Sequence, residues 1–327
     1  MLSLKLFLLI AAMNSTTVFP QSPASVPAFD AESFIQQNKF NSESIEKIVD
    51  YLKKQQDDLA LSYFADSVEV LIVGNGSSQP KGRNDLRHIL NNVRNRGLSI
   101  DVQLLRTFKV DQLYIVHYQI TGSTAPGGEQ NAEAQEPAIM IGCLAFLTVK
   151  DGMITRWENY HNPVAFYRPT DEILSGEAAE SFKLHEVIED RGALKNEELI
   201  QQYYQAINLN SDTIRASFFT PDAEMRNQAN GTCAQGVEEI KARWSLERAV
   251  YSSRIEMPSQ IQIAGNYAIV RSAVIATYQG DAGADGTQGK EVIFHPAAIY
   301  QLNDGRIKSV DYFYNEMELV IQLGTIP

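Results

Sequence analysis

The chain of 327 residues repeats itself once, and this duplication constrains the fold more than any other feature of the sequence. Asn75-Gly76-Ser77 corresponds to Asn230-Gly231-Thr232, and Asp151-Gly152-Met153-Ile154 corresponds to Asp304-Gly305-Arg306-Ile307. The paired anchors lie 153 to 155 residues apart. Solenoid repeats run only about 20 to 50 residues, whereas this period is the size of a domain. The sequence therefore predicts two related domains, each with its own core.

The N-terminal segment predicts export from the cytoplasm. Residues 1–13 are apolar apart from Ser3 and Lys5 and are too short to cross a bilayer, which takes about 20 residues. We expect a signal peptide at residues 1–24, a flexible Pro/Ser/Gln-rich leader at 25–40 and a secreted or periplasmic protein. A buried N-terminal helix is the alternative. The Asn75 and Asn230 tripeptides are glycosylation sequons, although Asn-Gly also marks turns.

Charge and cysteine content narrow the classes of partner. The formal charge of −12 comes without a basic cluster, which argues against a nucleic-acid partner and against docking on an anionic membrane. Cys143 and Cys233 are the only cysteines, and they form either an interdomain disulfide or two separate small buried residues. No spacing of His, Cys and Asp matches a zinc site, and we expect no cofactor.

Each half is predicted to be an α+β domain. We assign residues 41–167 to the first domain, 168–194 to a linker that is helical around 178–187, and 195–327 to the second domain. Both halves read as helix, strand, helix and then several strands, with Asn196 as a helix cap in the second half. Consecutive strands prefer antiparallel pairing, so each sheet is predicted to be antiparallel, curved and covered on one face by its N-terminal helices. Such a unit is a cone with an apolar interior.

The second half resembles the SnoaL-like (polyketide cyclase-like) domains of the nuclear transport factor 2-like superfamily. The resemblance rests on Tyr203-Tyr204-Gln-Ala-Ile207, on Phe218-Phe219-Thr-Pro-Asp222 and on the ending from Asp304 to Gly324. Through the internal repeat it extends to the first half. It implies tandem cystatin-like cones. It does not imply one activity, because this fold hosts cyclases, isomerases, dehydratases and silent binding modules.

Candidate catalytic residues lie on the last strand of each half. Alternation places Asp311, Phe313 and Asn315 on the same face as Ile307, and Glu158, Tyr160 and Asn162 on the same face as Ile154. By resemblance this face lines the cone. Glu158 and Asp311 are then the candidate acids or bases, with His117 as helper. The competing interpretations are an ion pair of Glu158 with Arg156 and a satisfied core histidine.

Two amides argue against turnover. By resemblance, Asn162 and Asn315 stand where SnoaL-like enzymes often carry an acid, and an amide does not serve in ordinary acid–base catalysis. We expect these amides to contact a ligand together with aromatic side chains of the cones. The aromatic members of this predicted set are Tyr118, Phe146, Tyr160, Tyr300 and Phe313.

The opposite sheet face carries Trp157, Tyr312 and Tyr314, which predicts that the sheet faces pair. The pairing is either an intramolecular pseudo-dimer or a homodimer. The first functional hypothesis is binding of a small apolar molecule without turnover. The alternatives are a cofactor-free isomerase, cyclase or dehydratase with an interior carboxylate, and a structural or protein-interaction module with filled cones.

Overall fold

The computed structural model describes residues 40–74, 79–80, 82–95, 98–124, 139–162, 185–189, 192–280 and 287–324. The predicted signal peptide and leader, the Asn75 sequon and residues 163–184 of the domain boundary and linker lie outside these ranges. In the described part of the chain, no helix combines the length and the apolar character needed to cross a membrane.

The described residues of the first half form the following helices and strands, which end with the linker strand β7. The elements are α3 (Ser42–Lys53), α4 (Asp57–Leu61), β1 (Phe64–Ile72), β2 (Gln79–Pro80), α5 (Arg83–Asn95), β3 (Leu98–Val110), β4 (Leu113–Thr124), β5 (Ile139–Lys150), β6 (Met153–Tyr160) and β7 (Glu186–Ile188). Its strands are ordered β2-β1-β6-β5-β4-β3-β7.

The second half repeats this plan. Its elements are α6 (Leu194–Asn208), α7 (Asp212–Ala216), β8 (Phe219–Asn227), β9 (Thr232–Gln235), α8 (Gly236–Val250), β10 (Tyr251–Ala264), β11 (Tyr267–Tyr278), β12 (Glu291–Phe294), β13 (Ala297–Asn303), β14 (Arg306–Phe313) and α9 (Glu316–Leu323). The strand order β9-β8-β14-β13-β11-β10 matches that of the first sheet. The two halves are therefore two copies of one α+β topology, as the repeat predicts.

Three pairings among the described strands differ from the antiparallel expectation. β1 pairs with β6, and β8 pairs with β14, in parallel. The short linker strand β7 also runs parallel to β3. The hairpin-linked strands β3 to β6 and β10 to β14 are antiparallel as expected. The physical reason is that helix α5 or α8 separates the first long strand from the meander, which leaves room for the crossover that parallel neighbours require.

Local sequence explains several element boundaries. Asn41 caps α3 with its side chain, and Ser44 bonds back to the backbone of Asn41. The two Asp-Gly turns close equivalent hairpins, because Asp151 and Asp304 adopt left-handed φ angles of 53° and 47° and each is followed by a glycine of positive φ.

Two local expectations were wrong. Helix α6 begins at Leu194 behind Ala193, and the side chain of Asn196 instead bonds Gly265. Residues 186 and 187, expected to be helical, belong to strand β7, which pairs with β3. The strands β12 and β13 are separated at Pro296, which lacks an N–H for the ladder. Strand β8 begins at Phe219, directly after Phe218.

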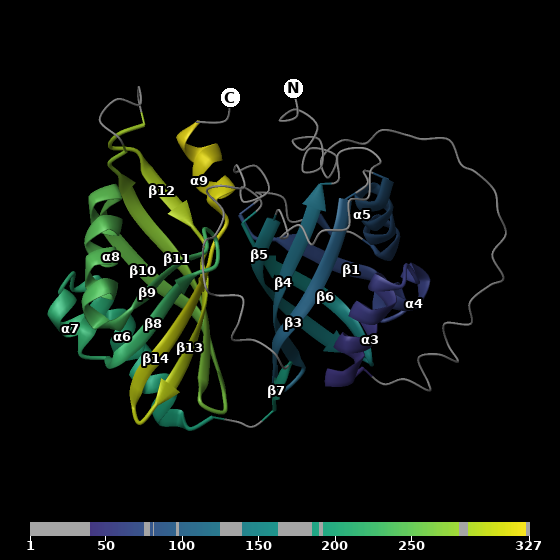
Figure 1. Ribbon diagram of the computed structural model, residues 1–327, viewed down its shortest axis with the longest axis horizontal. Helices are drawn as coiled ribbons and strands as arrows, with labels where there is room; N and C mark the ends of the chain where they lie inside the picture. Colours follow the sequence, from purple (N-terminus) through teal and green to yellow (C-terminus); the bar gives the residue numbers. More distant parts are fainter. Residues whose placement is uncertain are drawn as a thin grey trace, which may run out of the picture.

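The two sheets pack against each other, and the helices cover their outer sides (Figure 1). A shared apolar cluster draws residues from both domains and includes Phe108, Phe146 and Tyr160 of the first and Tyr267, Ile299 and Phe313 of the second. Each domain also has a core of its own between its sheet and its helices. We call the space between a sheet and its own helices the cone, and the contact between the two sheets the interdomain face.

Candidate functional site

A β-bulge near the start of each last strand decides which side chains enter the cone. In β14 the pairing with β13 passes from Leu302–Ile307 to Gln301–Ser309, which leaves Lys308 as an extra residue. In β6 the pairing with β5 passes from Val149–Ile154 to Thr148–Arg156 and leaves Thr155 extra. A bulge inserts one residue and reverses the alternation beyond it. Ile154 and Ile307 thus lie in the cones. Beyond each bulge, the residues that strict alternation would place on the same face lie on the opposite side of the sheet.

The bulges correct the expected placement of the candidate catalytic residues. Asp311 and Glu158 lie on the interdomain face, where each meets a basic residue of the other domain. Asp311 accepts hydrogen bonds from Arg106 of the first domain at 3.3 Å and from Gln228 at 3.0 Å. Glu158 pairs with Arg271 of the second domain and with Arg156 at 3.3 Å. Strict alternation places both carboxylates on the wrong side of the sheet.

His117 also lies on the interdomain face, fully buried and edge-on to Phe313 with ring centroids 5.2 Å apart. Burial lowers the pKa of His117 to about 4, because the dry surroundings disfavour the imidazolium, although Asp311 opposes this effect. Burial alone would raise the pKa of Asp311, but His117, Arg226 and Arg106 outweigh it and lower that pKa. The region is therefore an ionised carboxylate among guanidinium groups beside a neutral imidazole.

The amides Asn162 and Asn315 form a reciprocal pair of contacts across the interdomain face. Asn162 Nδ2 donates to the Ala229 carbonyl at 2.7 Å, and Asn315 Nδ2 donates to the Val73 carbonyl at 2.9 Å. Their Oδ1 atoms accept from the backbone of the first turn of α9. Gly74 allows this approach, since a Cβ there would lie 2.8 Å from the Asn315 Cβ. The amides bind backbone of the opposite domain instead of lining a cone.

Of the aromatic residues predicted to contact ligand, two lie toward cones and three lie on the interdomain face. Tyr118 packs in the first cone and Tyr300 in the second. Phe146, Tyr160 and Phe313 belong to the shared cluster. Conversely Trp157, Tyr312 and Tyr314, expected between the sheets, pack toward the cones. The ligand-binding roles assigned to these residues stay predictions. On the two last strands, the bulges determine which of these side chains lie toward the cones.

The second cone is filled by its own tyrosines. Tyr203, Tyr204 and Tyr300 form edge-to-face pairs, and the hydroxyls of Tyr204 and Tyr300 lie 3.1 Å apart. Burial raises the pKa of all three phenols, so they stay protonated donors at neutral pH. At the wide end, Val274, Ala276 and Phe294 of the sheet meet Leu319 and Leu323 of α9. Helix α9 thus closes this end of the cone.

A buried ion pair crosses the second cone beside these tyrosines. Glu256, only 1% exposed, accepts from Arg254 at 2.7 Å and from the Ser272 hydroxyl at 2.9 Å. Arg254 also reaches Tyr312 at 3.2 Å and Glu247 at 3.0 Å. Burial disfavours the cation, but Tyr312, Glu256 and Glu247 raise the Arg254 pKa well above its ordinary value. Both carboxylate oxygens of Glu256 are therefore engaged, and its charge is balanced.

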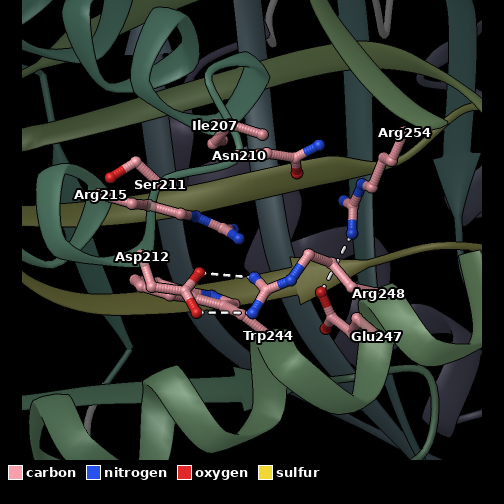
Figure 2. Close-up of a pocket in the computed structure, with 9 residues that line it drawn as sticks. All are labelled: Ile207, Asn210, Ser211, Asp212, Arg215, Trp244, Glu247, Arg248 and Arg254. Carbon is pink, nitrogen blue, oxygen red and sulfur yellow. Dashed lines mark hydrogen bonds and ion pairs between the residues drawn. The ribbon is translucent and has the colours of Figure 1, made fainter. Parts of the chain in front are cut away.

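A small pocket opens between α6, α7, α8 and the start of β10 (Figure 2). Its volume is about 20 Å³, close to the space that one water molecule needs. It is lined by Ile207, Asn210, Ser211, Asp212, Arg215, Trp244, Glu247, Arg248 and Arg254. Among the described residues, this is a polar pocket too small for an organic ligand of ordinary size.

The first cone differs in the polar groups that it holds. Tyr118 donates to Asn159 Oδ1 at 2.9 Å, and Asn159 Nδ2 lies 3.0 Å from His161 Nδ1. The equivalents of Asn159 and His161 in the second domain are Tyr312 and Tyr314, whose rings fill that cone. Burial lowers the pKa of His161 to about 4, which makes its ring a neutral donor and acceptor at pH 7.

Cys143 lies beside this chain of polar groups. It pairs with Tyr118 across β4 and β5 and is fully buried in a small cluster with Ile141, Tyr118 and Ile120. Burial raises the pKa of the Cys143 thiol and of the Tyr118 hydroxyl, so both stay protonated. Cys233 is exposed, and both cysteines are free thiols, so the possible interdomain disulfide does not form.

The sequence analysis did not single out several polar residues that lie toward the cones. The bulge in β6 turns Asn159 and His161 into the first cone. Cys143 in the first domain and Arg254, Glu256 and Ser272 in the second lie on other strands. The signal that could have found some of them is the repeat itself, since Asn159 and His161 align with Tyr312 and Tyr314 on corresponding strands. Nothing local marks Glu256, because it sits in a strand of ordinary polar and apolar alternation.

Comparison with known proteins agrees with this architecture. Residues 200–310 match the SnoaL-like domain family, so the second half of this two-cone protein carries a SnoaL-like domain. No curated protein matches the chain at a significant level of similarity.

Among solved structures, three similar chains illustrate the level of likeness. A protein from Catenulispora acidiphila DSM 44928 with a ketosteroid isomerase-like fold, in complex with trimethylamine, is 16% identical over 40% of this chain and 94% of its own, with a TM-score of 0.35. A nuclear transport factor 2-like protein of unknown function from Burkholderia pseudomallei K96243 is 12% identical over 40% and 98%, with a TM-score of 0.35. TerC co-crystallised with polyporic acid is 15% identical over 40% and 98%, with a TM-score of 0.35.

Proposed function

We propose that this protein binds a small, mainly apolar molecule in the cone of its first domain without turning it over, and that the second domain is its structural partner. The observation that carries the proposal is the hydrogen-bonded chain of Tyr118, Asn159 and His161 on an otherwise apolar surface. Ligand pockets typically combine apolar walls with a few polar groups that fix orientation. Tyr118 and His161 both keep some exposure, whereas Tyr203, Tyr204 and Tyr300 of the second cone are buried.

The side chains that occupy the second cone support the assignment of ligand binding to the first domain. The tyrosines of the second cone, its Arg254–Glu256 pair and the closing helix α9 occupy the space that a ligand would need. An interior carboxylate acting as acid or base is less well supported, because Arg254 and Ser272 bind both oxygens of Glu256. Export from the cytoplasm, predicted from the apolar start of the chain, is part of the same proposal.

The test is titration of the purified full chain with N-phenyl-1-naphthylamine, a neutral apolar dye that fluoresces when it leaves water. We expect one saturable site per chain. Tyr118→Phe combined with Asn159→Leu removes the polar chain and is expected to change the affinity for polar derivatives of the dye at least tenfold. Tyr204→Phe is the matched control in the second cone, and it should leave every affinity unchanged.

A second variant separates an open cone from a filled one. His161→Trp adds volume at a partly exposed position where the proposal places the ligand, so it should abolish dye binding with little loss of stability. If the first cone is filled by its own side chains, the added ring overpacks it and costs about 1–3 kcal/mol. Absence of dye binding in the wild type together with that destabilisation would overturn the proposal and favour an interaction module.

A further inference from the structure

The pocket between α6, α7, α8 and β10 presents hydrogen-bond donors that the surrounding protein does not satisfy. Trp244 is 1% exposed, and its indole Nε1 has no acceptor among the described residues. The buried Nε of Arg254 likewise has no acceptor in the described part of the chain. Both residues line the pocket. A buried donor without an acceptor costs roughly 1–3 kcal/mol, so this arrangement favours a bound acceptor.

Arg215 supplies an uncompensated positive charge to the same pocket. Its guanidinium stacks on the Trp244 ring at 3.9 Å, and its Nε donates to the Tyr203 hydroxyl at 3.2 Å. No ion pair joins Arg215 to a carboxylate within the described ranges. In Figure 2 the Arg215 and Arg254 side chains enter from opposite sides, above the pair of Asp212 and Arg248.

The carboxylates of the pocket are already engaged with other cations. Both oxygens of Asp212 bind Arg248, at 2.5 and 2.6 Å. Glu247 lies between Arg243, at 3.6 Å, and Arg254, which also holds Glu256. The network thus sets four guanidinium groups against three carboxylates, and Arg215 is the cation left over.

We propose that this pocket binds one small inorganic anion of halide size, with chloride as the expected occupant. The donors favour a bound acceptor, the leftover charge favours an anion, and the volume of about 20 Å³ suits an anion not much larger than a water molecule. The anion joins the ends of α6 and α8 to β10 and so secures the helices over the second cone. The site is separate from the first cone and does not depend on a ligand there.

Bromide tests the site directly, because it replaces chloride and scatters X-rays anomalously. Crystals of the full chain grown with bromide in place of chloride should show one anomalous peak within hydrogen-bond reach of Arg215, Trp244 and Arg254. Crystals of Arg215→Gln should lose that peak. Arg306→Gln removes an equal charge from an exposed turn and should keep it. A wild-type pocket without bromide, holding water alone, would overturn the proposal.

Fluorescence provides a second readout that needs no crystal. The chain has two tryptophans, and bromide quenches tryptophan fluorescence as a heavy atom. Bromide bound beside Trp244 adds a saturable component to the linear quenching that random collisions cause. Saturation at millimolar bromide in the wild type and in Arg306→Gln, but not in Arg215→Gln, is expected. Acetate at equal ionic strength should not compete with bromide, whereas chloride should. Purely linear quenching that is identical in all three proteins, or competition by acetate, would contradict a halide site.

Discussion

At the scale of single residues, the interdomain face sets an acid of each last strand against a cation of the other domain. Arg106 of the first domain meets Asp311 of the second, and Arg271 of the second meets Glu158 of the first. The last strand carries the acids there because Thr155 and Lys308 are extra residues in its ladder. The charges therefore determine how the two domains fit together.

The carboxylate of Asp311 is expected to stabilise the interdomain face strongly. It is 1% exposed and lies against Arg106 and Arg226. Asp311→Asn leaves these cations with an uncharged partner, and removal of one partner from a buried pair typically costs about 3–5 kcal/mol. Urea unfolding of the two proteins measures the difference. Glu158→Gln, at a position that keeps more exposure, should cost less.

The same pair of variants also tests the location of Asp311. Neither change should alter dye binding in the first cone, since both carboxylates face away from it. Loss of dye binding in Asp311→Asn without loss of stability would mean that this carboxylate lies in a cone.

Stability is expected to fall in mild acid because of His117. Its pKa is about 6.5 in the unfolded chain and about 4 when buried, so between these values the unfolded state binds more protons. The stabilisation is complete above pH 6.5 and is lost as the pH falls toward 4, by about 3 kcal/mol. Free energies of unfolding measured across this range test the sign.

His117→Phe is the informative comparison, because it keeps a ring against Phe313 and removes the titrating group. The variant should show a flatter pH dependence, with a remainder to which His161 contributes, since burial lowers that pKa to about 4 as well. An unchanged slope would show that His117 does not titrate abnormally.

At the scale of elements, α9 closes one end of the second cone. Asn315 caps it, it runs over the wide end of the second cone, and Gly324 ends it in a left-handed conformation with φ of 71°. Its apolar side chains pack on β11 and β12. Closure of the second cone is therefore a property of one eight-residue helix.

Truncation of one side chain of α9 should show how much its packing on the second cone contributes to the free energy of unfolding. Leu319 is 5% exposed within the cluster at the wide end, and Leu319→Ala is expected to cost about 2–5 kcal/mol. Ile321 lies in the same helix at 49% exposure, so Ile321→Ala should change the free energy of unfolding little. Equal effects of the two changes in thermal or urea unfolding would mean that α9 does not close the cone.

At the scale of the whole molecule, the duplication makes one chain equivalent to a dimer. Phe108 packs edge-on against Tyr267 with ring centroids 5.2 Å apart, and the shared cluster continues through both sheets (Figure 1). Burial of an apolar sheet face by a second copy of the same fold explains why neither sheet needs a further chain to cover it.

Separation of the domains should therefore produce a new dimer. A fragment of residues 192–327 exposes Tyr267, Ile299 and Phe313, and a two-fold copy would bring Arg271 of one fragment to Asp311 of the other. We expect a homodimer in sedimentation equilibrium, whereas the full chain stays monomeric. Arg271→Glu in the fragment should dissociate it by placing two acids together. A monomeric, folded fragment would contradict this account.

The sequence alone determined the duplication, the α+β class and the SnoaL-like character of the second half. Those conclusions rest on local signals that any fold must satisfy: the Asp-Gly turns, the helical periodicity and the spacing of the repeat anchors. The expectation that Tyr118 and Tyr300 lie toward the cones also agrees with the structure.

Only the tertiary structure decided which residues line the cones. Alternation assumes an unbroken ladder, and Lys308 and Thr155 break it at points that no local pattern marks, because a bulge depends on how the neighbouring strand pairs. Glu158, Asp311, Asn162 and Asn315 thus lie on the interdomain face instead of in the expected cavities. The Tyr118–Asn159–His161 chain and the Arg215 pocket likewise arise from contacts between elements distant in the chain, which the linear order of residues does not encode in a readable form.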